Sequence, residues 1–123
     1  MISVCMATYN GGRFIKEQID SILPQLSEDD ELIISDDGST DRTLEIIESY
    51  KDKRIKVFHH QKNPEYAKIK NSRNFYCATD NFENALKQAK GDYIFLSDQD
   101  DVWKTDKKEK MLKVLVDSKA DCV

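Results

Sequence analysis

Residues 93–101 read Tyr-Ile-Phe-Leu-Ser-Asp-Gln-Asp-Asp, so an apolar run of strand length is followed at once by three aspartates. The nearly continuous apolar run Tyr93–Leu96 predicts a strand that is buried on both faces, as in a parallel sheet. Three carboxylates within four positions are costly, since two unit charges about 4 Å apart repel by about 4 kcal/mol at a surface-like effective dielectric. The stretch therefore predicts a buried strand whose carboxyl end carries a polar site.

Apolar runs of strand length alternate with helical periodicity along the rest of the chain. Strands are predicted at 2–7, 31–35 and 54–58, and apolar stripes of helical spacing at 15–26, 43–50, 82–89 and 108–115. Residues 59–79 are expected to be irregular, and residues 120–123 to be a strand cut short. The alternation predicts an α/β fold, a three-layer α/β/α arrangement with a mainly parallel sheet and helices on both faces.

Polar clusters follow three of the predicted strands at the point where each ends. They are Thr8-Tyr9-Asn10, Asp36-Asp37-Gly38-Ser39 and Ser97-Asp98-Gln99-Asp100-Asp101. Ligands of open α/β sheets bind beyond the carboxyl ends of the strands, so one crevice is expected to collect all three clusters. Tyr9 is either a core aromatic or, because it lies past the strand end beside Asn10, a stacking surface for a nucleobase. A carboxylate after the second strand can accept a hydrogen bond from a base imide N–H. A plain strand-to-helix turn also explains residues 36–41 taken alone.

The aspartates of residues 98–101 favour a divalent cation. Oxygen ligands of this kind suit Mg²⁺ or Mn²⁺, which keep waters and bridge to substrate phosphates. A helix N-terminus accounts for one acidic residue such as Asp101, because aspartates there gain about 0.3–1 kcal/mol each, but it explains the whole cluster less well. An EF-hand loop is excluded, since Val102 would take a ligand position and Trp103 the position that needs glycine.

Composition narrows the classes of partner. The formal net charge is −4 and no basic stripe is present, so nucleic acid is not an expected partner. No apolar stretch approaches the roughly 20 residues of a membrane span. The five lysines of residues 104–113 are expected to form a solvated face, with contact to anionic lipid as the alternative.

The three widely spaced cysteines have no metal-ligand pattern and fit a reducing compartment. We therefore expect a cytoplasmic protein, with the inner face of the membrane as the alternative location. His59 and His60 are a poor metal pair, because adjacent residues of a strand point to opposite faces.

Three segments, in this order, resemble family 2 glycosyltransferases of the GT-A fold. They are residues 3–10 (SVCMATYN), 34–41 (ISDDGSTD) and 91–103 (GDYIFLSDQDDVW). The resemblance covers nearly the whole chain and implies a Rossmann-like nucleotide-binding half. Residues 1–123 would be the donor-binding domain, incomplete on its C-terminal side. Ala7 is a mild departure, because many members of the family carry proline there.

The resemblance implies a nucleotide site at the first two strand ends. Ala7, Thr8, Tyr9 and Asn10 would bind the nucleotide, with Tyr9 stacked on a uracil-like ring. Asp37 would accept a hydrogen bond from N3–H of the base.

The resemblance also makes Asp98-Gln99-Asp100 the DXD motif. Asp100 would be the main ligand of Mn²⁺ or Mg²⁺, with Asp98 as a second ligand, and both aspartates would serve catalysis. Asp98 and Gln99 would lie near the ribose and the diphosphate. A dication there stabilises the charge that develops on the leaving nucleoside diphosphate.

The implied activity is transfer of a sugar from a UDP- or dTDP-type donor to an acceptor hydroxyl, with inversion, in the synthesis of polysaccharide or cell-surface glycans. The acceptor would be a glycan or lipid-linked. The general base of the family lies further along its chain, so no residue here is assigned to it. Asp80 stands where close members often carry a basic residue, which leaves diphosphate contacts from that region open.

Two other classes of protein share features with this sequence. A phospho-acceptor receiver domain has a similar size and order of elements, but it needs an acidic pair after the first strand, where this chain has Thr8-Tyr9-Asn10. A nucleotide-sugar-binding module without catalysis stays open, because the residues that would distinguish it are not among these 123.

Overall fold

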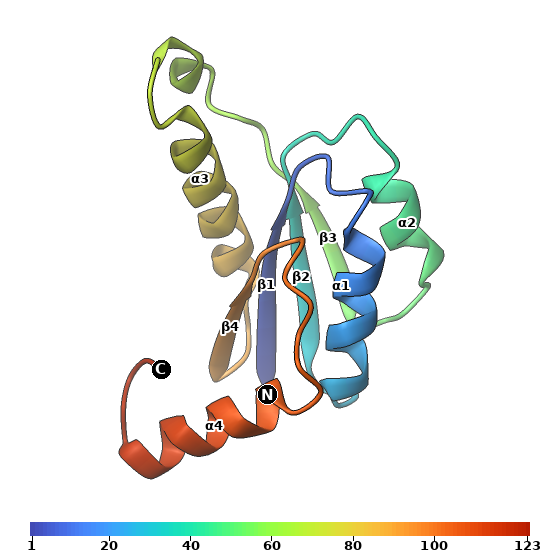
Figure 1. Ribbon diagram of the computed structural model, residues 1–123, viewed down its shortest axis with the longest axis vertical. Helices are drawn as coiled ribbons and strands as arrows, with labels where there is room; N and C mark the ends of the chain where they lie inside the picture. The colour runs from blue at the N-terminus through green and yellow to red at the C-terminus, as the bar shows by residue number, and fades with distance from the viewer.

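The sheet has four parallel strands in the order β3-β2-β1-β4, as Figure 1 shows for the computed structural model, which describes residues 1–123. The strands are β1 (Ile2–Thr8), β2 (Glu31–Asp36), β3 (Ile55–His59) and β4 (Tyr93–Ser97). The register pairs Thr8 with Asp36 and Asp36 with His59, so the carboxyl ends of three neighbouring strands lie level. The predicted parallel sheet is confirmed.

Helices cover both faces of this sheet (Figure 1). They are α1 (Ile15–Ile22), α2 (Thr43–Ser49), α3 (Arg73–Gln88) and α4 (Lys107–Ser118), with short 3₁₀ turns η1 (Leu23–Gln25) and η2 (Pro64–Lys68). α1 and α2 lie on one side, α3 lies on the other, and α4 lies near the amino ends of the strands. The three-layer α/β/α prediction is therefore confirmed. None of these helices is both long enough and apolar enough to span a lipid bilayer.

Side chains that alternate along β1 and β2 feed two separate apolar layers. The larger layer joins Val4, Met6, Leu32 and Ile34 to α1 and includes Phe95 and Trp103. The smaller layer joins Cys5 and Ile33 to Ala85 of α3. Because successive strand residues point to opposite faces, one strand sequence serves both layers, which explains why β1 and β2 are apolar almost throughout.

The prediction that residues 93–96 are buried on both faces is wrong. β4 pairs only with β1 and forms an edge of the sheet. Phe95 faces the larger apolar layer, whereas Ile94 and Leu96 are 49% and 56% exposed on the opposite side. Those two residues pair in register with Ser3 and Cys5, on the face that α3 covers only over the central strands.

Two predicted boundaries also differ from the structure. α3 begins at Arg73, within the segment expected to be irregular. Its first turns extend past the end of the sheet (Figure 1), and Phe75 there is 68% exposed, whereas the apolar stripe predicted at 82–89 covers only the later turns of the helix. Residues 120–123 form no strand.

Glu31 is the most deeply buried acidic residue at the amino end of the sheet, with 1% of it exposed. Its carboxylate accepts hydrogen bonds from Ser3 Oγ at 2.6 Å and from the backbone N–H of Lys90 at 2.9 Å, and it forms an ion pair with Lys56. Burial, the largest influence, raises the pKa of Glu31, but the bonds from Lys56, Ser3 and Lys90 outweigh it and hold the pKa below its usual value.

A lowered pKa in the folded chain means that ionised Glu31 stabilises the fold at neutral pH, and that this contribution is lost as the pH falls below about 4.3. We expect the free energy of unfolding to drop between about pH 5 and pH 3, with a shallower drop in Glu31→Gln. Urea unfolding across this range measures both slopes. Glu48→Gln makes the same chemical change on an exposed helix position and should keep the wild-type slope. An unchanged slope in Glu31→Gln would refute the assignment.

Candidate functional site

The carboxyl ends of β1, β2 and β4 meet α3 around a cleft of about 530 Å³. Three groups of residues line it: Ala7, Thr8 and Tyr9 with Asp37; Asp98, Gln99 and Asp100; and Lys62, Arg73, Asn74, Cys77, Ala78, Asn81 and Phe82 from the segment after β3 and from α3. The expectation that one crevice collects the three strand ends is confirmed. Of the residues that the resemblance assigns to the nucleotide or the metal, Asn10 alone lies outside the lining; it accepts a hydrogen bond from the Thr40 N–H at 2.8 Å.

Thr8 joins the end of β1 to the end of β2 and to α3. Its hydroxyl donates to Asp36 at 2.8 Å, and its carbonyl accepts from the N–H of Asp37 at 3.0 Å and from Asn81 Nδ2 at 3.1 Å. These bonds fix the backbone at the floor of the cleft and hold α3 against it. Asn81 is 2% exposed, and its side-chain oxygen has no partner.

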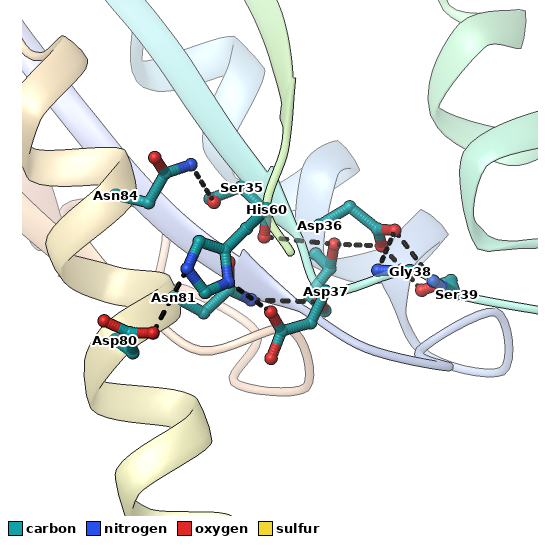
Figure 2. Close-up of polar contacts among 10 residues, drawn as sticks. Ser35, Asp36, Asp37, Gly38, Ser39, His60, Asp80, Asn81 and Asn84 are labelled. Atoms are coloured by element: carbon teal, nitrogen blue, oxygen red, sulfur yellow. Dashed lines mark hydrogen bonds and ion pairs between the residues drawn. The ribbon is translucent and has the colours of Figure 1, made fainter. Parts of the chain in front are cut away.

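The two consecutive aspartates after β2 have different surroundings. Asp36 is fully buried and accepts from the N–H groups of Gly38 at 3.0 Å and Ser39 at 2.8 Å, as Figure 2 shows. Gly38 has a φ of +76°, a region in which residues with a Cβ are strained. Asp36 therefore shapes the turn, while the next residue, Asp37, lines the cleft.

A histidine lies between two acidic residues at the wall of the cleft. His60 Nδ1 contacts Asp37 Oδ1, and His60 Nε2 lies 3.3 Å from Asp80 Oδ2 (Figure 2). The backbone N–H of His60 donates to the carbonyl of Asp36 at 2.8 Å, which continues the β2–β3 ladder. The sequence alone indicates a poor metal pair at His59 and His60 and no other role for His60. The contact depends on strand register, which the sequence does not display.

Tyr9 presents a half-exposed ring at the mouth of the cleft. Lys62 Nζ lies 3.1 Å from the ring centroid, a cation–π contact. The side chain of Gln99 accepts from the Tyr9 N–H at 3.0 Å and donates to the Tyr9 carbonyl at 3.2 Å. Gln99 thereby ties the loop after β4 to the loop after β1.

The aspartates of residues 98–101 differ in whether they line the cleft. Asp98 and Asp100 line the cleft, whereas Asp101 does not. Burial first, and then the negative charges of Asp101 and Asp100, raise the pKa of Asp98. A bound cation would offset this repulsion.

Two cleft carboxylates fit Mg²⁺ or Mn²⁺ bound with substrate. No three His, Cys, Asp or Glu side chains in the chain converge on one point. Mg²⁺ is commonly held by one or two carboxylates together with substrate phosphates and water. The residues present therefore suit a cation that arrives with a phosphate-bearing ligand, and they do not form a closed protein cage.

Sequence reasoning missed the basic and amide side chains of the cleft. Lys62, Arg73 and Asn74 come from a segment without recognisable periodicity, and Asn81 stands among the apolar residues of α3. The start of α3 at Arg73 is the missing information for Arg73 and Asn74, because it places the first turns of this helix beside the strand ends.

Comparison with known proteins settles the family. The sequence profile described as Glycosyl transferase family 2 matches residues 3–123. The chain belongs to glycosyl transferase family 2. Among curated relatives, the dTDP-rhamnosyl transferase RfbG of Shigella flexneri is 40% identical over 95% of the chain and 39% of its own length. The Escherichia coli enzyme WfaP, named UDP-Glc:alpha-D-GlcNAc-diphosphoundecaprenol beta-1,3-glucosyltransferase, is 39% identical over 87% of the chain and 38% of its own length.

Solved structures agree with this family membership. S. aureus TarS 1–349 in complex with UDP matches with a TM-score of 0.76 and 28% identity, over 98% of this chain and 33% of that one. Glucosyl-3-phosphoglycerate synthase from Mycobacterium tuberculosis, in complex with Mn²⁺, UDP and glucosyl-3-phosphoglycerate, matches with a TM-score of 0.62 and 25% identity, over 94% of this chain and 39% of that one. The GT-A fold is thus confirmed, and the chain spans about two fifths of the length of the curated relatives it matches.

Proposed function

We propose that this chain binds the donor in a glycosyltransferase that moves a sugar from a nucleoside-diphosphate sugar to an acceptor hydroxyl. The convergence of Tyr9, Asp37 and the pair Asp98 and Asp100 on one cleft carries the proposal. The aromatic ring would stack on a base, and the single carboxylate would accept a hydrogen bond from the imide of that base. The paired carboxylates would hold a cation bound to the diphosphate. Family membership gives the reaction class.

The nucleobase end of the cleft suits uracil or thymine. Tyr9 would stack on the base once Lys62 moves off its ring, and Asp37 would accept the N3–H. Ala7 and Thr8 would line the pocket floor, and Asn10 would act by holding the adjacent turn. Relatives named for UDP-glucose and dTDP-rhamnose support a pyrimidine donor.

The diphosphate end combines carboxylates with basic side chains. Asp98 and Asp100 would hold Mn²⁺ or Mg²⁺, which, when bound, supplies Lewis-acid stabilisation of the departing diphosphate. Lys62 and Arg73 line the same cleft and would neutralise the remaining phosphate charge. Gln99 would act on the ligand indirectly, because both polar atoms of its side chain bond to the backbone of Tyr9.

The whole enzyme would transfer the sugar with inversion to a glycan or a lipid-linked acceptor, in polysaccharide or cell-surface glycan synthesis. A relative named for a diphosphoundecaprenol acceptor supports a lipid-linked acceptor. Such an acceptor would lie in a membrane, and the enzyme would act in the cytoplasm at the inner face of that membrane. The residues that bind the acceptor and activate its hydroxyl would lie in a further part of the protein, with residues 1–123 as the donor domain.

Binding of UDP with and without metal tests the proposal. We expect calorimetry to give at least about tenfold tighter UDP binding with Mn²⁺ than with a chelator, a difference of about 1.4 kcal/mol. Asp100→Asn should remove this difference, because it replaces the main proposed ligand. Asp101→Asn removes a charge outside the cleft and should retain it. Metal-independent binding by the wild type, or full metal dependence in Asp100→Asn, would count against the site.

A further inference from the structure

The imidazole of His60 lies between the Asp37 carboxylate and α3. Figure 2 shows its two ring nitrogens pointing at different acidic residues, Asp37 and Asp80. We propose that His60 is a positioning residue that holds the Asp37 carboxylate in the orientation that distinguishes uracil from cytosine, with Asp80 holding His60 in turn. This inference rests on the proposed function and adds a selectivity device to it.

The Asp37 carboxylate depends on His60 for its orientation. Only 3% of the side chain is exposed, and His60 Nδ1 is its sole hydrogen-bond partner within the chain. The backbone of Asp37 is fixed separately, by its N–H bond to the Thr8 carbonyl. A carboxylate accepts and does not donate, so Nδ1 carries the hydrogen of the contact. One carboxylate oxygen is thereby occupied, and the other is left to accept from a ligand in the cleft.

His60 is itself contacted through its backbone and on the far side of its ring. Its backbone N–H bonds to the Asp36 carbonyl at 2.8 Å, and its ring is 14% exposed. On the far side, Asp80 Oδ2 lies 3.3 Å from Nε2 and belongs to α3. The ring therefore has a fixed position between β2 and α3. Asp80, which stands where close members of the family often carry a basic residue, would hold the ring in this arrangement.

Fixed orientation matters because the two pyrimidines differ at the atom that Asp37 would meet. Uracil presents a donor at N3, whereas cytosine presents an acceptor there, which would face a carboxylate oxygen. A site built around one hydrogen bond rejects a ligand that lacks the donor by large factors, because the buried acceptor is then unpaired. If the carboxylate turns freely, it can turn away from the wrong base and the discrimination shrinks.

Two neutral variants of His60 separate the roles of its nitrogens. In His60→Asn the amide nitrogen lies near the place of Nδ1 and can still donate to Asp37, but the side chain no longer reaches Asp80. In His60→Gln the amide lies nearer the place of Nε2, and the donor to Asp37 is lost. We would measure the dissociation constants of UDP and CDP for each variant with Mn²⁺ present, and their thermal unfolding.

The expected results are ratios of affinity. The wild type should prefer UDP over CDP by about 100-fold or more, and His60→Gln should reduce this preference by about tenfold. His60→Asn should recover most of it, whatever the two substitutions do to stability. Asn84 lies on the same helix as Asp80, outside the cleft, and bonds to Ser35 of β2. Asn84→Ala removes this bond and serves as the control for local disturbance.

Each outcome decides the inference. An undiminished preference in His60→Gln, or an equal loss in both His60 variants, overturns the positioning role while leaving the proposed function intact. A wild type that binds UDP no better than CDP contradicts the proposed uracil site itself, and the inference falls with it.

Discussion

Asp36→Ala is expected to lower the free energy of unfolding by about 3 kcal/mol or more, the largest loss of any single polar substitution at this site. The fully buried carboxylate accepts from the Thr8 hydroxyl and from the N–H groups of Gly38 and Ser39. Hydrogen bonds to a charged acceptor contribute about 1.5–3 kcal/mol each, and the donors left behind are partly screened from water. Urea unfolding followed by circular dichroism measures the loss.

Asp37→Ala is the matched control, one residue along the chain. It removes the same chemical group but leaves a single unpaired donor, His60 Nδ1, so the loss of stability should be about 1 kcal/mol. UDP affinity should nevertheless fall more than about tenfold in Asp37→Ala, because the proposed acceptor of the base is gone. Equal destabilisation by the two substitutions would show that the division between a turn-forming and a ligand-facing aspartate is wrong.

The different roles of Asp36 and Asp37 are only partly predictable from the sequence. The meeting of three polar clusters was predictable, because parallel strands bring their carboxyl ends to one edge. The sequence also favours Asp37 over Asp36 through family resemblance. It contains no signal for His60, whose place beside Asp37 follows from the β2–β3 register. Strand register is a long-range property that local patterns do not encode.

Periodicity failed where burial is incomplete. The first turns of α3 contribute no residue to either apolar layer, and the cleft residues Arg73 and Asn74 were missed with them. The prediction for Tyr93–Leu96 failed in the opposite sense, because its apolar residues indicate burial on both faces while one face of β4 is exposed. Both errors come from the same assumption, that hydrophobic pattern and solvent exposure within this chain coincide.

Trp103→Ala should destabilise the fold by about 3–5 kcal/mol, the usual cost of removing a large aromatic side chain from a core. Trp103 is 4% exposed and packs against Phe95 of β4 with ring centroids 5.6 Å apart. Its backbone N–H donates to Ser21 Oγ at 2.9 Å. The acidic loop thus runs between two fixed points, β4 and Trp103, and truncation of the ring frees one of them.

The same substitution should weaken metal-dependent UDP binding, because Asp98 and Asp100 lose the anchor that holds their loop at the cleft. Trp103→Phe separates this effect from loss of the core. It keeps an aromatic ring on Phe95 and removes a buried indole N–H that has no hydrogen-bond partner. It should therefore cost about 1 kcal/mol and retain the metal dependence of binding. Chemical unfolding and calorimetry, run under conditions where each variant is folded, measure the two effects. Full metal-dependent affinity in folded Trp103→Ala would mean that the acidic loop is ordered without its aromatic anchor.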